Sequence, residues 1–362
     1  MRIVIFFFVH LLLLNFNNRL LAENLYLDSP GNTGTLRFEI DNDTIWNKDN
    51  NFTNGWSLQY HTVRSANWEE SKNSGFIKWV GENFPTLDND GFIVRNCHGI
   101  GQNMITPGDL NAETHQEGDL PYAGTLTYTL NWQSFNRKMA RNLQVSVGLL
   151  GQVSFAEQFQ KFVHNDLGKG DDPQGWDNQR DTEPIINVGY EHPWRLAYLG
   201  NYTNDWAGQI SLIPSVSFGN LFTAAEAGLA LRFGWNMLEG FNTYPAPPGR
   251  GFFQASHLPK PSSASPHSFE IVLGARGCAL GYSVIYDGSI ITDDDRNVDR
   301  NTFIFARGIG AFYHYYKLFS IRFTFQKSTD FLDEDSIPDP ESGEDKTNAD
   351  VSYGSLIIDL YF

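Results

Sequence analysis

Hydrophobic and polar residues alternate with period two along most of this chain. The segment TLTYTLNWQ, residues 125–133, places leucine, tyrosine and tryptophan on one side and threonine, asparagine and glutamine on the other. Such alternation is typical of a β-strand that faces two different environments. The pattern recurs at 143–149 and 319–326, where Arg322 faces opposite a row of phenylalanines. That opposition favours a polar interior and an apolar exterior.

A polar interior inside an apolar exterior is what a transmembrane β-barrel requires. A soluble β-sandwich also alternates, but aromatic residues make up 14% of the chain and charged residues only 19%. Many aromatic residues also fall near predicted strand ends, as membrane-interface girdles do. We therefore predict an all-β fold, a twelve-stranded antiparallel transmembrane β-barrel. The predicted strands cover residues 34–41, 53–63, 91–106, 121–133, 142–154, 184–199, 207–218, 224–237, 268–286, 300–316, 318–328 and 351–362.

The number of strands is even, as in single-chain bacterial barrels. With both ends of this strand series in the periplasm, the connections after odd-numbered strands open to the outside. Residues 64–90 and 238–267 are then long periplasmic segments, for which the sequence suggests no role.

One short segment breaks the strand pattern. In FAEQFQKFVH, residues 155–164, a helical period puts phenylalanines and Val163 on one face and Glu157, Gln160, Lys161 and His164 on the other. Gln160 and His164 are neighbours one turn apart. A short α-helix with a polar His/Gln face, in an extracellular loop of a barrel, is where we expect chemistry first.

The N-terminus has the features of an exported protein. An apolar run, Ile3–Leu14, follows Arg2, and the small residue Ala22 is a candidate cleavage point, so residues 1–22 are predicted to be a signal peptide and residues 23–362 the barrel domain. The apolar run is shorter than a membrane-spanning helix needs. The expected location is the bacterial outer membrane.

Acidic residues outnumber basic ones, with a net charge of −16. This excess argues against a nucleic-acid partner, and no obligate protein partner is indicated. The acids concentrate in two tracts, 293–300 and 330–350, which we interpret as solvated loops. Cys97 and Cys278 allow one disulfide in an oxidising compartment, although the sequence does not show that they meet.

Several short motifs together carry a family resemblance. FEIDND and NNFTNG flank the first predicted hairpin, and GQNMITP, GDLPYAG, the Gln160/His164 helix, PQGW and GNLFTAAEAGLALRFG follow in order. Each motif is weak alone, but their order and spacing resemble the outer-membrane lipid A 3′-O-deacylases over nearly the whole chain after residue 22.

The resemblance implies a Ca²⁺-dependent esterase that removes the 3′-linked acyloxyacyl chain of lipid A, the membrane anchor of lipopolysaccharide, in the outer leaflet. It implies an active site at the extracellular face, between the outer barrel wall and a loop helix. It assigns His164 to the activation of water and Gln160 to the position one turn earlier. Asn42, Asp43 and Thr53 form the polar cluster on the first hairpin.

The implied chemistry is reasonable for these residue types. Histidine supplies a base near neutral pH, and calcium prefers oxygen ligands such as the Asp43 carboxylate. The resemblance also implies an acidic second ligand after His164, for which Asp171 is the candidate; because the stretch 168–176 is longer than the resemblance leads us to expect, the alternatives are Asp172 or neither residue. The chain has no Gly-x-Ser-x-Gly elbow and too few cysteines and clustered histidines for a zinc site.

Two other functions fit the same fold. A non-enzymatic porin or scaffold barrel would make the polar grouping a coincidence, and a phospholipase of the same design would use the same residues on a glycerophospholipid.

Overall fold

The computed structural model describes residues 26–29, 32–43, 51–115, 118–162, 173–245, 253–315, 318–333 and 349–362, with only the backbone at Asn51 and Thr53. The predicted signal peptide, 1–22, lies outside these residues.

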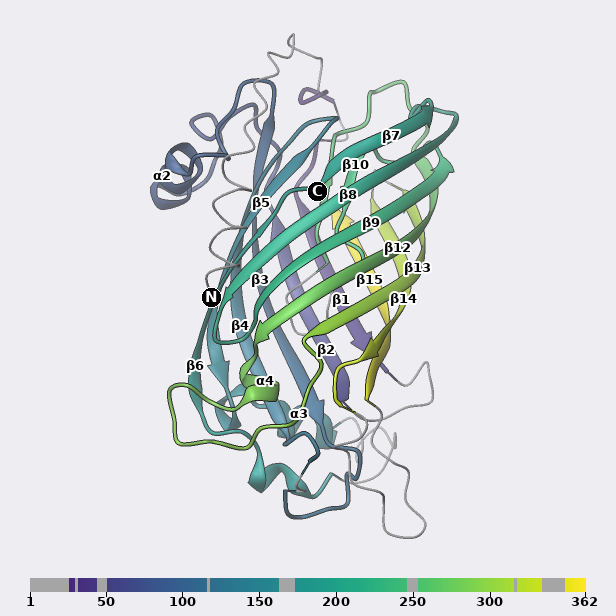
Figure 1. The fold of residues 1–362 in the computed structure, drawn as a ribbon. Coiled ribbons are helices and arrows are strands. Elements are labelled where there is room, and N and C mark those ends of the chain that lie inside the picture. Colours follow the sequence, from purple (N-terminus) through teal and green to yellow (C-terminus); the bar gives the residue numbers. More distant parts are fainter. Residues whose placement is uncertain are drawn as a thin grey trace.

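Most of the described strands form one antiparallel sheet that closes on itself as a barrel (Figure 1). Its strands are β1 (Thr35–Asn42), β2 (Asn51–His61), β3 (Ile93–Thr106), β4 (Ala123–Phe135), β5 (Ala140–Leu150), β6 (Glu183–Glu191), β7 (Trp194–Gly200), β8 (Trp206–Gly219), β9 (Thr223–Trp235), β12 (His267–Tyr282), β13 (Phe303–Tyr315), β14 (Phe319–Asp330) and β15 (Asp350–Tyr361). β1 pairs with β15, and β6 pairs with β8.

β6 and β7 together occupy one strand position. Both pair with β8 in a continuous register, Glu191 with Ser215 and then Trp194 with Leu212. The interruption falls at Pro193, which has no N–H for a ladder bond. The barrel therefore has twelve strand positions, which confirms the predicted fold and the single strand predicted over 184–199.

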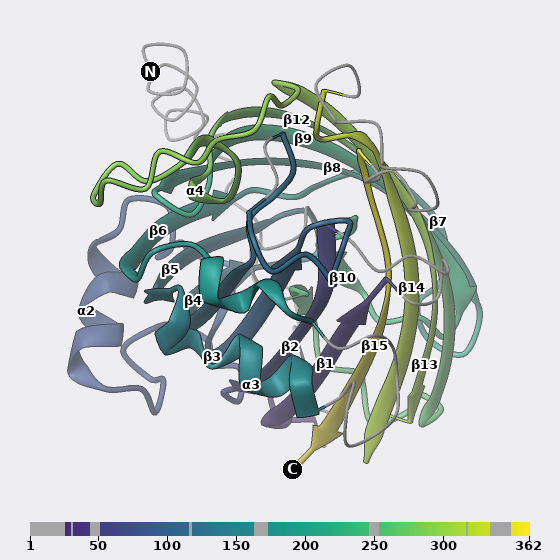
Figure 2. The same cartoon turned by 90° about the horizontal axis from the view of Figure 1, so that it is seen from below.

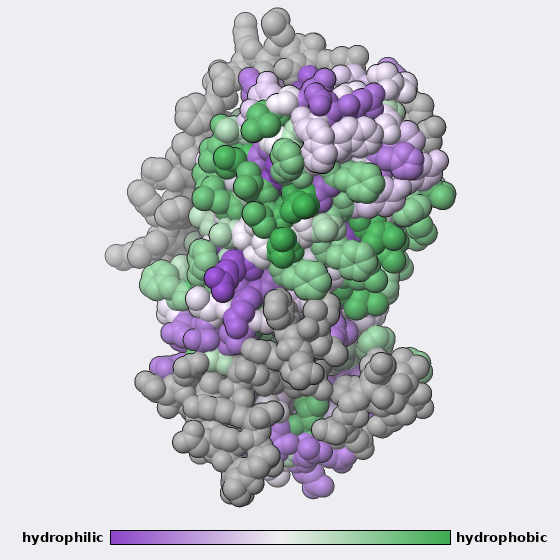
Figure 3. Space-filling model, turned by 90° about the vertical axis from the view of Figure 1, so that its right-hand side faces the viewer, coloured by the Kyte–Doolittle hydropathy of each residue, from purple (hydrophilic) through white to green (hydrophobic). Residues whose placement is uncertain are grey.

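The wall separates polar from apolar side chains as the period-two pattern predicted. Arg322 is buried inside the barrel, while Phe323 next to it is exposed on the outside. Seen from the right-hand side of Figure 1, the surface carries an apolar band between polar ends (Figure 3). Such a band is the surface that a transmembrane barrel presents to lipid.

The two ends of the barrel differ. The end at which β1 finishes and β2 begins, called the loop end, carries the short helices α3 (Ala156–Lys161) and α4 (Val284–Asp287), and the 3₁₀ turns η2 (Gln152–Ser154) and η4 (Gly175–Asn178). The opposite end, called the turn end, carries helix α2 (Gly75–Asn83) and the start of β1 (Figure 1). The connections after odd-numbered strands were predicted to share one end of the barrel. Their described parts do lie together at the loop end, which confirms this grouping.

Two predicted strands were too long at the loop end. The strand predicted over 142–154 ends at Leu150, because Gly151 adopts a φ of 90° and the chain turns into η2. The strand predicted over 268–286 ends at Tyr282, and α4 follows, with the Ser283 side chain accepting a hydrogen bond from the Ile285 N–H. Local turns and caps end these two strands earlier than the alternation of the sequence predicted.

The segment 238–267, which the sequence left without a role, enters the lumen from the turn end. Its strands β10 (Gly240–Asn242) and β11 (Ala255–His257) pair inside the ring of barrel strands (Figure 2). Arg37 and Arg95 on the wall donate to the carbonyls of Phe253 and Ala255 at 2.8 and 2.9 Å. We call the described part of this segment, 238–245 and 253–266, the lumen plug.

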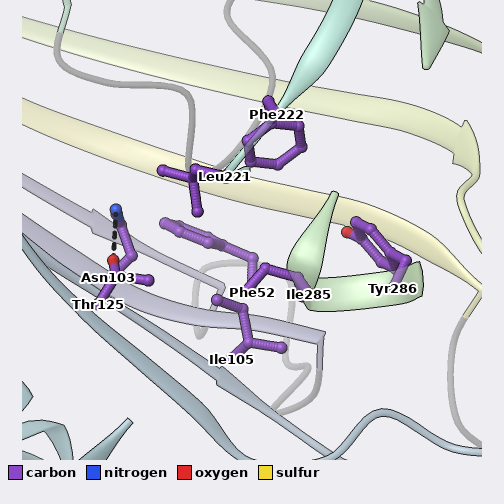
Figure 4. Close-up of a pocket in the computed structure, with 8 residues that line it drawn as sticks. All are labelled: Phe52, Asn103, Ile105, Thr125, Leu221, Phe222, Ile285 and Tyr286. Carbon is purple, nitrogen blue, oxygen red and sulfur yellow. Dashed lines mark hydrogen bonds between the residues drawn. The ribbon is translucent and has the colours of Figure 1, made fainter. Parts of the chain in front are cut away.

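An apolar cluster fills the lumen near the loop end. A small cavity there, drawn in Figure 4, is lined by Phe52, Asn103, Ile105, Thr125, Leu221, Phe222, Ile285 and Tyr286. Its volume is about 10 Å³, enough for about one water molecule and too small for an acyl chain.

No disulfide joins Cys97 and Cys278, so the bond that the sequence allowed does not form. Among the described residues, no helix has the length and apolar character needed to span a membrane.

Candidate active site on the outer wall of the barrel

Helix α3 lies against the outside of the barrel at the loop end (Figure 2). Gly124 on β4 permits this close approach, because a Cβ at that position would lie 2.2 Å from Ser154 Oγ and 2.4 Å from Ala156 Cβ. Gln102 on β3 fixes the start of the loop by donating from Nε2 to the Ser154 carbonyl at 2.6 Å, and it accepts from Trp56 Nε1 at 3.0 Å. The wall and the loop are therefore held together by both packing and hydrogen bonds.

The two faces of α3 are reversed relative to a helix that packs on an apolar core. Gln160 is 2% exposed, whereas Phe155 and Phe162 are 62% and 51% exposed. Phe155 also adopts a left-handed backbone with a φ of 59°, which is costly for a bulky residue. Gln160 thus turns toward the barrel and Phe155 and Phe162 turn away from it, while Phe159 packs partly buried on the barrel side.

Gln160 is oriented by Trp176 of η4. Trp176 Nε1 donates to Gln160 Oε1 at 2.7 Å, and an indole nitrogen can only donate. The oxygen of the amide must therefore face Trp176, which leaves Nε2 as the free end. Nε2 is buried and has no hydrogen-bond partner among the described residues. The site therefore presents a buried N–H donor that is oriented to meet an acceptor.

A second polar group stands on the outer wall at the end of β1. Asn42 continues the outward row of Leu36 and Phe38, and it pairs directly with Asn54 on β2. The Asn54 Oδ1 is buried and has no partner among the described residues. Asp43, the next residue after Asn42, is also buried. Amide and carboxylate oxygens of this kind are the donors that Ca²⁺ prefers.

Helix α3 points from β4 toward this polar group. Ala156 at its start lies over Gly124 on β4, and the Phe159 ring lies 6.5 Å from the Trp56 ring on β2. Six residues of α-helix span about 9 Å, which matches two strand spacings of about 4.8 Å. The next strand in that direction is β1, with Asn42 at its end.

The structure describes some of the sequence-predicted site residues and not others. It brings Asn42 and Asp43 to the hairpin edge and buries Gln160 beside the wall, as described above. The backbone of Thr53 lies at a bulge in β2, between the pairings of Phe52 and Asn54 with β3. His164 and Asp171 lie outside the described residues. Within the described residues, no group of three or more His, Cys, Asp or Glu side chains is arranged to hold a metal ion.

Three residues that complete this surface were not singled out from the sequence. Asn54, Trp56 and Gln102 share the outer face, but their positions on strands resemble ordinary strand positions. The available signal was the run of polar residues in NNFTNG, which is unusual on a lipid-facing row. Tyr122 of the GDLPYAG motif and Trp176 of the PQGW motif pack on each other under α3, with ring centroids 4.8 Å apart.

The loop after η4 is clamped to the loop after α4. Arg180 Nη1 donates to Asp294 Oδ1 at 3.1 Å, and Arg296 Nη2 to Asp294 Oδ2 at 2.8 Å. Burial alone would raise the pKa of Asp294, but the Arg296 hydrogen bonds, the Asp181 N–H and the Arg180 charge outweigh it and lower the pKa to about 2. The clamp is therefore fully ionised at neutral pH, and it anchors the segment that carries Trp176.

A family profile and a solved structure agree with this architecture. The profile of a family described as "Outer membrane protein LpxR" matches residues 5–343. The solved structure of LpxR from Salmonella typhimurium has a TM-score of 0.69 and 15% identity, covering 91% of this chain and 100% of that one. The β domain of the Bordetella autotransporter BrkA has a TM-score of 0.40 and 8% identity, covering 91% and 97%. A search of curated protein sequences gave no match.

Proposed function

Because the chain belongs to the LpxR family of outer membrane proteins, we propose that it is a Ca²⁺-dependent esterase that removes the 3′-linked acyloxyacyl chain of lipid A. The observation that carries the proposal is the pair of unsatisfied polar atoms on the outer wall. Gln160 Nε2 offers a buried donor, and Asn54 Oδ1 beside Asn42 offers a buried acceptor. A donor for a carbonyl oxygen and an oxygen ligand for a cation are the two groups that ester hydrolysis assisted by calcium needs.

The residues at the end of β1 fit calcium by their chemistry. Asn42, Asp43 and Asn54 supply hard oxygen donors on adjacent strands, and we assign them the ion together with the predicted ligand Asp171. When bound, Ca²⁺ would supply positive charge for the oxygen that becomes negative in the transition state.

The general base is supplied by a residue of the loop that carries α3. His164 follows Phe162 by two residues, a chain reach of at most about 7 Å. We assign it as the base that takes a proton from water as the water oxygen attacks the acyl carbonyl carbon. The bond from that carbon to the sugar oxygen then breaks, and the imidazolium returns the proton to the sugar oxygen. One ester and one water give one carboxylic acid and one sugar hydroxyl.

Gln160 is better suited to bind the substrate carbonyl than to orient the imidazole of His164. Its free end is an N–H donor, which cannot accept the second N–H of an imidazole. We therefore assign Gln160 Nε2 to the ester carbonyl oxygen or to the oxygen that develops charge, and Thr53 to the orientation of substrate or water. Trp176 acts as a positioning residue, because its indole holds the amide in this orientation.

The lipid substrate would reach this surface from the membrane side. The exposed phenylalanines of α3 provide an apolar surface beside the outer wall, where acyl chains can pack. The lumen argues in the same direction, because among the described residues the lumen plug and the apolar cluster already occupy space that the diffusion pathway of a porin would need.

The test uses the full chain purified in detergent micelles with lipid A and CaCl₂, analysed by mass spectrometry. We expect loss of one acyloxyacyl group, abolished by a calcium chelator and by His164→Ala. The Lys161→Ala variant, which removes a surface ion pair with Glu157 on the same helix, is the matched control and should remain active. Unchanged activity of His164→Ala would refute the mechanism. Faster release of fatty acid from glycerophospholipid than from lipid A would assign the site to a phospholipase instead.

A further inference from the structure

Residues 65–92, which include most of the segment 64–90 for which the sequence suggested no role, cover part of the outer wall at the turn end. Trp132 on β4 donates from Nε1 to the Ile77 carbonyl at 3.0 Å, and Tyr190 on β6 donates to Thr86 Oγ1 at 2.7 Å. A Cβ at Gly81 would lie 2.3 Å from the Trp68 ring, so α2 packs closely onto the segment beneath it. The helix is therefore fixed to β4–β6 on the outside of the barrel (Figures 1 and 2).

The exposed side of α2 is aromatic. Phe76 and Trp79 are each 61% exposed, although both are large apolar side chains that globular proteins usually bury. The Phe76 ring also contacts the Trp132 ring edge to face, with centroids 6.4 Å apart. The aromatic surface of α2 is thus continuous with the outer wall.

The helix has three faces rather than two. At 100° per residue, Phe76, Trp79 and Val80 share one face, Ile77 and Gly81 a second, and Lys78 and Glu82 a third, with the faces roughly 120° apart. The second face is buried against the barrel side. An apolar face and a charged face on the two remaining sides suit a helix that lies between lipid and water.

The height of α2 along the barrel agrees with a position in the membrane. On the other strands, exposed apolar side chains continue to the turn end of the wall: Trp206 on β8, Phe233 on β9, Phe269 on β12 and Leu360 on β15. On β4–β6 the corresponding outward residues, including Trp132 and Tyr190, are covered by the segment 65–92. Nearer the loop end these strands expose Tyr128, Val147 and Ile186 again. On the side of β4–β6, α2 therefore stands where the apolar band would otherwise continue.

We propose that α2 is an interfacial membrane helix, whose Phe76/Trp79 face takes the place of the covered wall and inserts into the headgroup and upper acyl region of the bilayer at the turn end of the barrel. The partner is the phospholipid leaflet itself. The continuity with the lipid-facing band selects lipid over a soluble protein, and aromatic side chains, tryptophan above all, are favoured at membrane interfaces. With the loop end facing outside, as the proposed function requires, this leaflet is the periplasmic one.

The test places a fluorescent probe on each free face of the helix in the full chain. Trp79→Cys and, separately, Glu82→Cys are made in a background with Cys97→Ala and Cys278→Ala, labelled with bimane and reconstituted into phosphatidylethanolamine/phosphatidylglycerol vesicles. Phe76→Cys is the substitute if the first variant does not fold, and heat-modifiable migration in gels reports folding. Each sample is quenched by lipids brominated on the acyl chain and, separately, by aqueous iodide.

The proposal expects opposite behaviour at the two positions. The probe at residue 79 should be quenched at least twofold more by brominated lipid than the probe at residue 82, and iodide should show the reverse order. Equal, strong iodide quenching at both positions would place α2 in water and overturn the proposal. A residue 79 probe that neither agent quenches would mean that protein covers the face, from a second copy or another partner, and would also overturn it. None of these outcomes depends on lipid A hydrolysis.

Discussion

The indole nitrogen of Trp176 donates to Oε1 of Gln160 across 2.7 Å, between a 3₁₀ turn and a helix that are 16 residues apart in sequence. This bond determines which end of the glutamine amide is free. Without it, the amide could rotate by 180° and present an acceptor instead of a donor.

Trp176→Phe should therefore reduce the deacylation rate strongly while it reduces the free energy of unfolding only slightly. The ring can still pack on Tyr122, so we expect a stability loss of about 1 kcal/mol. The rate of lipid A deacylation should fall about tenfold or more, because an oriented donor is lost. Tyr122→Phe is the control, since it removes the 3.1 Å bond to the Leu110 carbonyl without affecting the amide. Equal losses in the two variants would show that Trp176 acts only through packing.

Gly124→Ala should separate activity from barrel folding. The added Cβ collides with Ser154 and Ala156, so the loop has to move away from the wall by more than a few tenths of an ångström. We expect a strong loss of deacylation with normal heat-modifiable migration of the barrel. Gly277→Ala is the matched control, because a Cβ there meets nothing within 4 Å. If Gly124→Ala is fully active, the close approach of α3 is not needed for the reaction.

Most of the barrel was predictable, because a wall between lipid and a polar lumen imposes period two on every strand. The alternation identified all twelve strand positions and the side on which Arg322 lies. The strand ends at Leu150 and Tyr282 were not predictable, since local turns and caps decide them.

The lumen plug and the covering segment 65–92 were also missed. Their contacts are made with residues far away in sequence, such as Arg37 with Phe253, and no local period reports such a contact. Within the site, Asn42, Asp43 and Gln160 came from a family resemblance. Asn54 emerges only when the register of β1 and β2 is known.

Acid should loosen the clamp between the two loops at Asp294. Its pKa of about 2 lies below the ordinary 3.8, so the folded state favours the ionised carboxylate. The stability from this group is complete above about pH 4 and is lost as the pH falls toward 2. Pepsin nicking of the loops should accelerate over this range, and Asp294→Asn should nick rapidly even at pH 4. A variant as resistant as the parent at pH 4 would show that the clamp does not order the loops.

The lumen plug should depend on Arg232. Its guanidinium forms a buried pair with Glu270, with Nε–Oε1 and Nη2–Oε2 distances of 2.6 and 2.7 Å, and Nη2 also donates to the Leu238 carbonyl of the plug at 2.8 Å. Arg232→Met should destabilise the barrel by about 3–5 kcal/mol in urea titrations, because Glu270 becomes an unpaired buried charge. The double variant Arg232→Met/Glu270→Leu should recover much of this loss. Failure of the double variant to recover any stability would mean that the plug contacts, not the ion pair, dominate.

Calcium dependence should respond to Asn54, a residue that only the strand register identifies. Its Oδ1 is buried on the outer wall opposite Asn42, and more negative charge among oxygen ligands raises calcium affinity. Asn54→Leu should raise the calcium concentration for half-maximal deacylation about tenfold or more, and Asn54→Asp should lower it, with heat-modifiable migration unchanged in both. Asn103→Leu is the comparison, since Asn103 lies one residue before Met104, the β3 partner of Asn54, but faces the lumen. If Asn54→Leu and Asn54→Asp leave the calcium titration unmoved, the ion does not bind at this pair of strands.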